Sequence, residues 1–429
     1  MKPVPDKRRD PALPGRVLFL NDVGFQYGAG IAQARQLEAI MSLGLEAGVL
    51  TWAHGNIQLE NVASRAIDSD LWLGIREVNH LEGGKTMTDA TVVAGLLMEV
   101  ARFDPDVVIV GNLHAARWPF QLLLALRSIG CRVVTFVHDA YLYTGRCAYP
   151  GSCRLYLTGC NATCPTAQEY PALEPELIAG AWQLRRDIFG GSYGVEVVAN
   201  SHWSAQMFRT AIPSCPAVAT VELGADEHTF APGDKAAARQ RLGLPAGKPV
   251  VLCAAVNFQE HRKGGRQLRE IIAALGDSVT FAAFGHNANE IPGLIGLGYH
   301  LQAHKRAGIY QAADLYLGTA TEEAFGQTVM EAHLCGVPAV VFQAGGVVEI
   351  VEQDVTGKLV PNGDAAAAIA AIRALLADPA TLAGMAARAR EVAVARFGLP
   401  AHAERWLRYL TGRLVDHDSS VVSADARTP

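Results

Sequence analysis

Short apolar runs rich in valine, isoleucine and leucine alternate along this chain with longer stretches in which apolar residues recur at helical spacing. Such an alternation is typical of βαβ units, whose parallel strands are buried on both faces. We expect two series of strands with helices between them. The first series is predicted at 16–20, 45–52, 107–110, 132–137 and 195–199, and the second at 249–254, 279–284, 315–317 and 339–342. The pattern therefore predicts an α/β protein with two Rossmann-like parallel sheets.

The division between the two series falls near 224–232, where the segment GADEHTFAPGD interrupts both kinds of periodicity. A chain of 429 residues suits two domains, each of about 200 residues. Near the end, a Gly-Leu-Pro sequence stops one helix and a new helical pattern begins. We predict a flexible tail at 1–15, an N-terminal domain at 16–225, a C-terminal domain at 226–398, a last helix at 399–415 and a disordered tail at 416–429.

Half of the residues are apolar and 18% are charged, which favours a large core over intrinsic disorder. The formal net charge of −5 argues against a nucleic-acid polymer as the main ligand. The first apolar run, at 17–20, is too short for the core of a signal peptide. No stretch reaches the ~20 apolar residues of a membrane-spanning helix. We therefore expect a cytoplasmic protein.

The clearest chemical signal lies in the segment 318–357, GTATEEAFGQTVMEAHLCGVPAVVFQAGGVVEIVEQDVTG. Glu323 precedes a predicted helix and Glu331 lies two turns along it, with seven residues between them. The first N–H groups of a helix have no partner within the helix, so they favour an anion such as a pyrophosphate. Carboxylates accept strong hydrogen bonds from sugar hydroxyls. The segment therefore suits a nucleotide-sugar, although two glutamates alone would also fit an ordinary solvated helix.

The residues that flank the two glutamates resemble a known family. The matching stretches are Glu323-Ala324-Phe325-Gly326, Glu331-Ala332, Gly336-Val337-Pro338, Gly345-Gly346 and Glu349. In this order they resemble the E-x7-E region of retaining glycosyltransferases of the GT-B fold. That large family, of the family-4 type, includes sucrose synthases and bacterial polysaccharide transferases. The resemblance implies two Rossmann-like domains facing across a cleft, with the last helix crossing back onto the first domain.

The resemblance also implies roles on the donor side. Glu323 would reach the sugar hydroxyls, and Glu331 would accept hydrogen bonds from the ribose hydroxyls. The phosphates and the sugar would be taken by the backbone of Phe325, Gly326, Gln327 and Thr328. No divalent cation or other cofactor is required for catalysis when helix dipoles and a lysine neutralise the diphosphate.

A second donor element is the pair Arg262 and Lys263, which follows the predicted strand 249–254. Cations at this place can neutralise a pyrophosphate and the charge that grows as the sugar leaves. Alone, such a pair would more often be a solvated loop. Lys263 matches the family, but the arginine that the family carries five residues before it is Phe258 here. Either Arg262 neutralises the pyrophosphate in its place, or another residue supplies that positive charge.

Two features of the first domain point to the acceptor side. A Gly-Ala-Gly turn at 28–30 opens a helix, and such a turn is either a close approach to a ligand or only a tight turn. By resemblance, Gly30 would lie against the donor phosphate and the acceptor. His138 ends the fourth predicted strand, at the sheet edge where ligands bind. A lone histidine is more often structural, but this one matches the family's His-Asp, which faces the reacting sugar.

The implied reaction is same-face attack by an acceptor hydroxyl, with His138 and Glu323 as catalytic residues and the departing phosphate helping to take the proton. We expect a glycan or lipid-linked acceptor, in bacterial cell-surface polysaccharide synthesis. The alternatives are a nucleotide-sugar epimerase or phosphorylase on the same fold, and a non-catalytic nucleotide-sugar-binding protein. A lipid-linked acceptor would allow peripheral contact with the inner membrane through residues 117–120, although a core helix explains that pattern better.

Four of the eight cysteines crowd into eighteen residues: Cys147, Cys153, Cys160 and Cys164. Their segment, 145–166, resembles a four-cysteine insertion in a subgroup of these transferases tied to capsule or exopolysaccharide synthesis. In a reducing cytosol, close cysteines more often bind a metal than form disulfides. We expect a structural zinc site, with unligated thiols and disulfides as alternatives, in a lobe that shapes the acceptor site.

Overall fold

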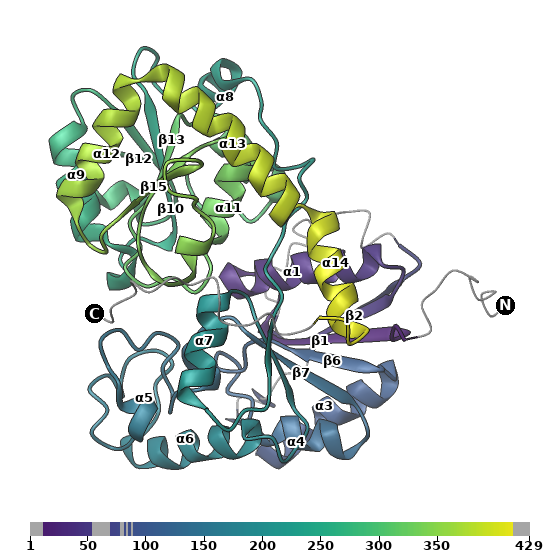
Figure 1. Cartoon of the computed structure of the whole chain (residues 1–429). Helices are drawn as coiled ribbons and strands as arrows, with labels where there is room; N and C mark the ends of the chain where they lie inside the picture. The colour runs from purple at the N-terminus through teal and green to yellow at the C-terminus, as the bar shows by residue number, and fades with distance from the viewer. Residues whose placement is uncertain (1–11, 54–68, 78–80, 83–84, 87–88, 415–429) are drawn as a thin grey trace.

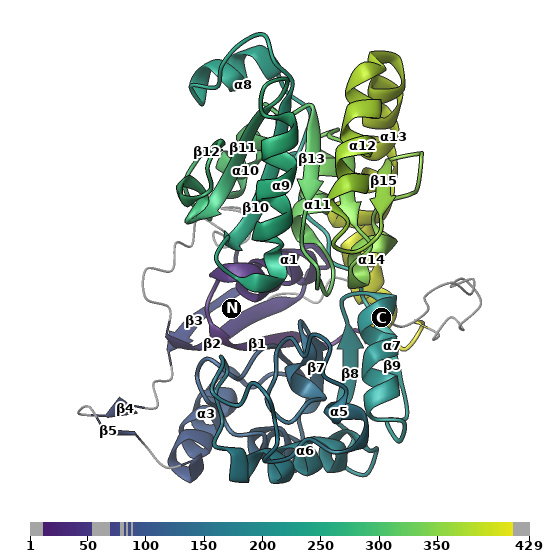
Figure 2. The same ribbon diagram turned by 90° about the vertical axis from the view of Figure 1, so that its left-hand side faces the viewer.

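The computed structural model describes residues 12–53, 69–77, 81–82, 85–86 and 89–414. Two α/β domains lie one above the other in Figure 1, and each is built on a parallel sheet with helices packed around it. Figure 2 shows the same two domains from the side. The expected architecture of two Rossmann-like sheets is confirmed.

The N-terminal domain contains seven strands in the order β3-β2-β1-β6-β7-β8-β9, and all neighbours are parallel. The order reverses between β1 and β6, and such switch points are where α/β sheets bind ligands. The strands are β1 (Arg16–Val23), β2 (Glu46–Ala53), β3 (Trp72–Glu77), β6 (Val107–Val110), β7 (Arg132–Val137), β8 (Glu196–Ala199) and β9 (Val218–Thr220). The helices are α1 (Tyr27–Ser42), α3 (Asp89–Phe103), α4 (Gln121–Ser128), α5 (Leu155–Thr158), α6 (Pro175–Phe189) and α7 (His202–Ala211). A separate antiparallel pair joins β4 (Leu81–Glu82) and β5 (Lys85–Thr86).

The C-terminal domain contains six parallel strands in the order β12-β11-β10-β13-β14-β15. Its switch point lies between β10 and β13. The strands are β10 (Val250–Asn257), β11 (Thr280–His286), β12 (Leu294–Gly296), β13 (Leu315–Gly318), β14 (Ala339–Phe342) and β15 (Gly357–Val360). The helices are α8 (Lys235–Arg241), α9 (Gly265–Leu275), α10 (Ala303–Tyr310), α11 (Gln327–Leu334), α12 (Ala365–Ala377) and α13 (Pro379–Phe397).

The last helix, α14 (Leu399–Leu410), leaves the C-terminal domain and packs on the N-terminal one, beside α1 (Figure 1). Trp406 is buried and stacks on Phe136 of β7, with ring centroids 6.0 Å apart. The hydroxyl of Tyr409 donates to Glu196 at 2.7 Å. This crossing is the one that the resemblance implied. The predicted tails fall largely at residues 1–11 and 415–429, outside the described residues.

The interior strands of both sheets were predicted from the sequence, but the predicted series did not include β3, β9, β12 and β15. All four are edge strands. Both β15 and β9 are only partly buried: Lys358 and Leu359 of β15, and Ala219 and Thr220 of β9, are half-exposed. Because an edge strand is covered incompletely, it lacks the continuous apolar run that marks an interior parallel strand.

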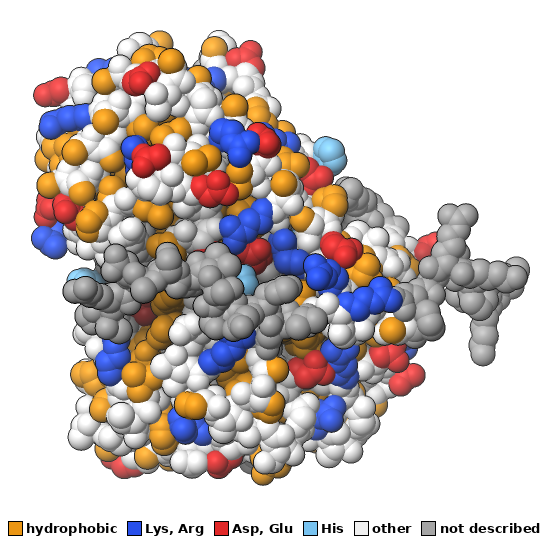
Figure 3. Space-filling model, in the orientation of Figure 1, with side chains coloured by type: hydrophobic (Ala, Val, Ile, Leu, Met, Phe, Trp, Pro, Cys, Tyr) orange, Lys and Arg blue, Asp and Glu red, His pale blue; other side chains and the backbone are white. Residues whose placement is uncertain are grey.

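Within the described ranges, no single helix has the length and apolar character needed to span a membrane. Among the described helices, α12 and α13 meet those criteria only when taken together, and they are bent by 103° relative to each other. Trp118 and Phe120, from the segment considered for membrane contact, are buried in the core of the N-terminal domain. The core explanation of that segment therefore holds. On the face that Figure 3 shows, basic and acidic side chains are interspersed.

His333 of α11 is a buried histidine whose two ring nitrogens have no hydrogen-bond partner among the described residues. Burial lowers its pKa to about 4. The unfolded chain takes up a proton near pH 6.5, whereas the folded chain does so only near the lowered pKa. The folded state therefore loses stability as the pH falls from about 6.5 towards 4.

We expect His333→Leu to raise the melting temperature relative to the unsubstituted protein, and by more at pH 5 than at pH 7.5. Thermal unfolding followed by circular dichroism at the two pH values measures this difference. The matched control is His304→Leu on exposed residue His304 of α10, which should change neither value by more than a degree or so. An equal change at both pH values for His333→Leu would contradict the assigned neutral state.

Candidate active site

A cavity of about 140 Å³ lies between the two domains, beside the ends of β10 and β13. Gly28 and Ile31 of α1 line it from the N-terminal domain. Lys263, Glu323 and the start of α11 line it from the C-terminal domain. The cavity therefore lies at the switch point of the second sheet, where α/β proteins bind their ligands.

Glu323 and Lys263 form an ion pair in this cavity, with Lys263 Nζ 2.9 Å from Glu323 Oε2. Lys263 ends a 3-10 turn, His261–Lys263, that follows β10, and Glu323 lies in the loop between β13 and α11. Burial raises the pKa of Glu323, but the charges of Lys263 and Arg262 outweigh it and hold the pKa below its ordinary value. Glu323 is thus ionised near neutral pH and accepts hydrogen bonds.

The N-terminus of α11 points its first residues at the cavity. Gly326, Gln327 and Thr328 all line it. Gly326 has φ 106° and ψ 50°, a left-handed conformation that glycine adopts at low energy, and it begins the helix without a side-chain cap. The first N–H groups are therefore left for a ligand. Phe325 is buried against Phe397 at 5.9 Å, so only its backbone remains a candidate contact.

Glu331 is held by three side chains. Arg35 of α1 donates to Oε1, and Arg306 of α10 lies 3.1 Å from the same oxygen. Tyr310 donates to Oε2 at 2.8 Å. Burial raises the pKa of Glu331, but Arg306 and Arg35 outweigh it and the net pKa is lowered. A ribose hydroxyl would therefore have to share a carboxylate that is already mostly satisfied.

Arg35 also joins the two domains. Its Nη1 donates to the amide oxygen of Gln327 at 2.7 Å, and the Gln327 amide nitrogen donates to the carbonyl of Gly28 at 2.8 Å. Sequence reasoning missed Arg35 and Arg306. The available signal for Arg35 was an arginine within a helix of mainly small and apolar residues, because a buried charge needs a partner.

Arg262 lies apart from the cavity lining. Its guanidinium carbon is 3.8 Å from the ring centroid of Tyr149, and its Nη2 is 2.6 Å from Glu260. Its Nη1 is buried and has no partner in the described chain. Arg262 still lowers the pKa of Glu323 through its charge. Whether it replaces the family's arginine stays a prediction.

On the acceptor side, Gly30 packs against its own loop. A Cβ at this position would lie 2.2 Å from the carbonyl oxygen of Gly24, so a larger residue would displace the turn before α1. Gly28, not Gly30, lines the cavity. His138 follows β7 and is buried beside Phe136, at 4.9 Å between ring centroids. Burial lowers the pKa of His138 to about 4, so its ring is neutral near pH 7.

A second histidine, His114, lies beside Asp139, the residue that follows His138. Sequence reasoning did not identify His114. Its Nε2 is 3.3 Å from Asp139 Oδ2, and its Nδ1 is 2.7 Å from the hydroxyl of Tyr170. Burial lowers the pKa of His114, but Asp139 outweighs it and the net pKa is raised. Asp22, at the end of β1, lies 3.9 Å away. His114 follows β6 closely, and the carboxyl ends of parallel strands meet at one edge of the sheet. This position could have indicated that His114 lies near His138.

The four clustered cysteines surround a second, much smaller cavity of about 10 Å³ in the N-terminal domain. None of the four forms a disulfide bond in the described structure. In the described part of the chain, no three histidine, cysteine, aspartate or glutamate side chains already have the arrangement of a metal site. The expected zinc site therefore stays a prediction.

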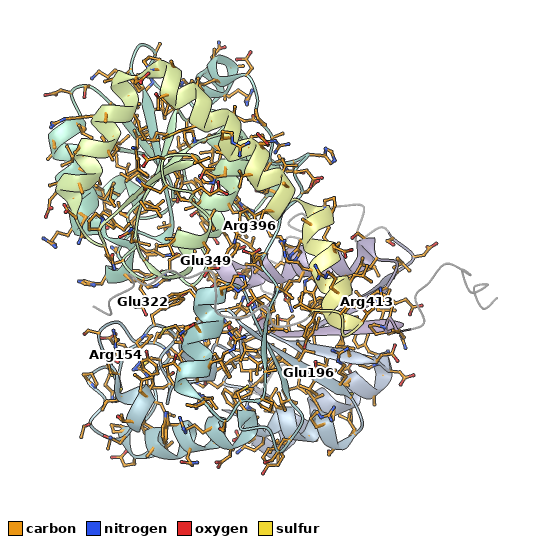
Figure 4. The ribbon with its side chains drawn as sticks, in the orientation of Figure 1. Arg154, Glu196, Glu322, Glu349, Arg396 and Arg413 are labelled. Atoms are coloured by element: carbon orange, nitrogen blue, oxygen red, sulfur yellow. The ribbon has the colours of Figure 1, made fainter. Side chains whose placement is uncertain are left out.

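The lobe that carries these cysteines reaches across to the donor side. Tyr149 of the lobe covers Arg262, and the backbone N–H of Gly151 donates to Glu322 at 3.2 Å. Figure 4 shows Glu322 on the upper domain and Arg154 on the lobe at the same side of the junction. Glu322 immediately precedes Glu323. The lobe thus contacts both loops that carry the donor-site charges.

The chain matches a family model. Residues 298–392 match the model of the glycosyl transferases group 1, and this range includes Glu323 and Glu331. A D-inositol 3-phosphate glycosyltransferase of Catenulispora acidiphila is 30% identical over 338 residues, which cover 73% of each chain. The chain belongs to the group 1 glycosyl transferases. Another D-inositol 3-phosphate glycosyltransferase, from Mycolicibacterium vanbaalenii, is 31% identical over 43% of this chain and 47% of its own.

Several solved structures have the same fold as this group 1 glycosyl transferase. HepE of Anabaena in complex with UDP-glucose has a TM-score of 0.70 at 20% identity, covering 92% of this chain and 99% of that chain. A sucrose-phosphate synthase of Thermosynechococcus elongatus has a TM-score of 0.69 at 18% identity, covering 92% and 98%. The GT-B arrangement is thereby confirmed. By its family, the chain is a glycosyltransferase.

Proposed function

We propose that the chain transfers a sugar from a nucleotide-sugar to a hydroxyl of a glycan or lipid-linked acceptor, with retention of anomeric configuration, in bacterial cell-surface polysaccharide synthesis. The observation that carries the proposal is the Glu323–Lys263 pair at 2.9 Å, in a cavity bounded by both domains and by the start of α11. This arrangement offers a carboxylate for sugar hydroxyls next to a cation and free N–H groups for a diphosphate.

Lys263 and the N-terminus of α11 would share the charge of the diphosphate. As the bond between sugar and phosphate breaks, negative charge grows on the phosphate, and preorganised donors stabilise it. Glu323, ionised beside Lys263, would hold the sugar hydroxyls. The lysine then serves two anions, which fixes the sugar relative to its leaving group.

Retention without a covalent intermediate is supported by how the two carboxylates are engaged. A retaining glycosidase needs a carboxylate placed as a nucleophile at the anomeric carbon. Among the described residues that line the cavity, Glu323 and Glu331 are the carboxylates. Glu323 is paired with Lys263, and Glu331 is held by Arg35, Arg306 and Tyr310. We therefore assign same-face attack by the acceptor hydroxyl, with a phosphate oxygen taking its proton.

The acceptor would lie against the edge of the first sheet, where His138, His114 and Asp22 come together. The neutral ring of His138 exchanges hydrogen bonds with hydroxyls without adding charge. Two carboxylates, Asp22 and Asp139, favour a neutral polyol over an anion at this edge. The names of the relatives at about 30% identity favour a second acceptor class, an inositol phosphate, whose phosphate would have to lie away from these two carboxylates.

The test is a transfer assay in which each of several nucleotide-sugars is combined with oligosaccharide, polyprenyl-linked or inositol 3-phosphate acceptors. Mass spectrometry follows the acceptor, and chromatography follows the nucleotide. We expect one donor to give an acceptor heavier by one sugar and an equal amount of nucleoside diphosphate. Binding with no product would identify a nucleotide-sugar-binding protein, and conversion of the donor's sugar into an isomeric sugar without any acceptor would identify an epimerase. Either result would overturn the proposal.

A further inference from the structure

Two buried arginines in the cysteine lobe and its supporting helix have no carboxylate partner within the described residues. Arg146 is 3% exposed and donates to the carbonyls of Pro171, Thr166 and Glu169. Arg185 of α6 is also 3% exposed and donates to the carbonyls of Tyr141 and Ala181. Neither makes an ion pair with aspartate or glutamate there. A charge buried without a counter-charge is strongly unfavourable. We therefore expect negatively charged groups near these two guanidinium groups.

Arg146 faces the hydroxyl of Thr166 and a thiol. Arg185 lies over the rings of Phe120 and Tyr141. Arg146 Nη1 lies 3.9 Å from Cys164 Sγ, and electrostatic coupling joins Arg146 to Cys147 as well. The positive charge of Arg185 also acts on Cys160 and Cys147, at longer range. Because the thiolate form of cysteine is the anion, a cluster of thiolates would supply the missing negative charge.

The four sulfur-bearing residues converge on one place. Cys147, Cys153, Cys160 and Cys164 all line the cavity of about 10 Å³, together with Arg146. Cys147 Sγ and Cys164 Sγ are both near the hydroxyl of Thr166, at 4.0 and 3.8 Å. The cavity is about the size of one water molecule, so it suits a single ion rather than a cluster or an organic group.

The segment around the cavity has little regular secondary structure. Apart from α5, which has four residues, residues 143–174 contain no helix or strand. Segments of this length without secondary structure are uncommon in compact domains unless something holds them. Four sulfurs around one cavity are the ligand set of a tetrahedral zinc site, whose zinc–sulfur distances are ~2.3 Å.

We infer that Cys147, Cys153, Cys160 and Cys164 bind one structural zinc ion as thiolates, with Arg146 and Arg185 balancing its charge. Four thiolates and one divalent cation carry a net charge of −2, which the two guanidinium groups neutralise. Four thiolates select zinc over magnesium or calcium. Because all four positions are occupied by protein, the ion is structural and does not enter the reaction.

The ion would also fix the contact between the lobe and the donor site. Tyr149 and Gly151 lie between Cys147 and Cys153 in the sequence, and they touch Arg262 and Glu322. If the proposed donor role of Lys263 and Glu323 holds, loss of the ion should raise the KM for the nucleotide-sugar. This consequence rests on the proposed function, whereas the metal site does not.

The test uses the full chain purified without chelators, under reducing conditions and with zinc in the growth medium. Mass-spectrometric metal analysis should find about one zinc per chain. Cys160→Ser and Cys164→Ser should each lower the zinc content at least about tenfold. Cys215→Ser is the matched control, because Cys215 lies outside the lobe and a serine can keep its hydrogen bond to the carbonyl of Ala217.

A second measurement serves if the serine variants fail to fold. In the unsubstituted protein, cobalt replaces zinc, and a tetrahedral cobalt–thiolate site gives an intense visible absorption that zinc removes. Thiol-reactive mercurials should release the bound zinc in proportion to the cysteines modified. Three results would overturn the inference: no zinc and no cobalt absorption, disulfides among these cysteines by peptide mass mapping, or zinc retained by both variants. None of these measurements depends on catalytic activity, so they separate failure of the site from failure of the proposed function.

Discussion

Glu323→Gln should lower kcat for sugar transfer by at least about a hundredfold. The substitution keeps the size and one acceptor oxygen of the side chain but removes the charge that pairs with Lys263 at 2.9 Å. Because charge-assisted hydrogen bonds to sugar hydroxyls are about twice as strong as neutral ones, the sugar is held less firmly as its bond to phosphate breaks. Initial rates of nucleoside diphosphate release, measured over a range of donor concentrations, give kcat and KM separately.

The same substitution should leave the fold nearly unchanged, with a difference of less than about 1.5 kcal/mol in the free energy of unfolding. Glu270→Gln is the matched control, since Glu270 pairs with Arg266 on the exposed face of α9. Its kcat should stay within about twofold of the unsubstituted value. A Glu323→Gln variant that is folded and retains most of its kcat would show that Glu323 does not act on the sugar.

Glu331→Gln should lower the free energy of unfolding by about 3–5 kcal/mol. The carboxylate of Glu331 is the described counter-charge of both Arg35 and Arg306, and all three side chains are buried. Glutamine keeps a hydrogen-bond acceptor but leaves two buried positive charges uncompensated. Urea unfolding followed by fluorescence measures the change. Glu331 thus stabilises the folded state more than Glu323 does.

A double-substitution cycle isolates the contact between the domains. Arg35→Met with Glu331→Gln removes one of the two uncompensated charges, so the double variant should be more stable than the sum of the single changes predicts. A loss of less than about 1 kcal/mol for Glu331→Gln alone, the range of an exposed pair, would contradict the buried ion-pair network.

The interior of the fold follows from the sequence more readily than its edges do. Interior strands such as β6 and β14 are buried at every position, so each appears as an unbroken apolar run. The edge strands β9 and β15 are partly exposed and have no such signature. The crossing of α14 could be inferred only through resemblance, because the partners of Trp406 lie in the other domain.

The candidate site shows a similar division. Residues that stand at strand ends or helix starts, such as Lys263, Glu323 and Thr328, could be located from local pattern, and the structure brings them to one cavity. The partners that determine their environment could not. Arg35 is 296 residues from Glu331 along the chain, and no local pattern reports a contact at that separation. The roles of His138, Gly30 and Arg262 stay predictions.

The most direct test of the central claim is the anomeric configuration of the first product, read from the coupling constant of its anomeric proton by NMR. The carboxylates of this cavity are paired with Lys263, Arg35 and Arg306, and we assign same-face attack by the acceptor. The account therefore predicts that the product keeps the anomeric configuration of the donor. An inverted product would contradict the account, because inversion requires a base that activates the acceptor on the opposite face of the sugar, and this mechanism assigns no residue to that task.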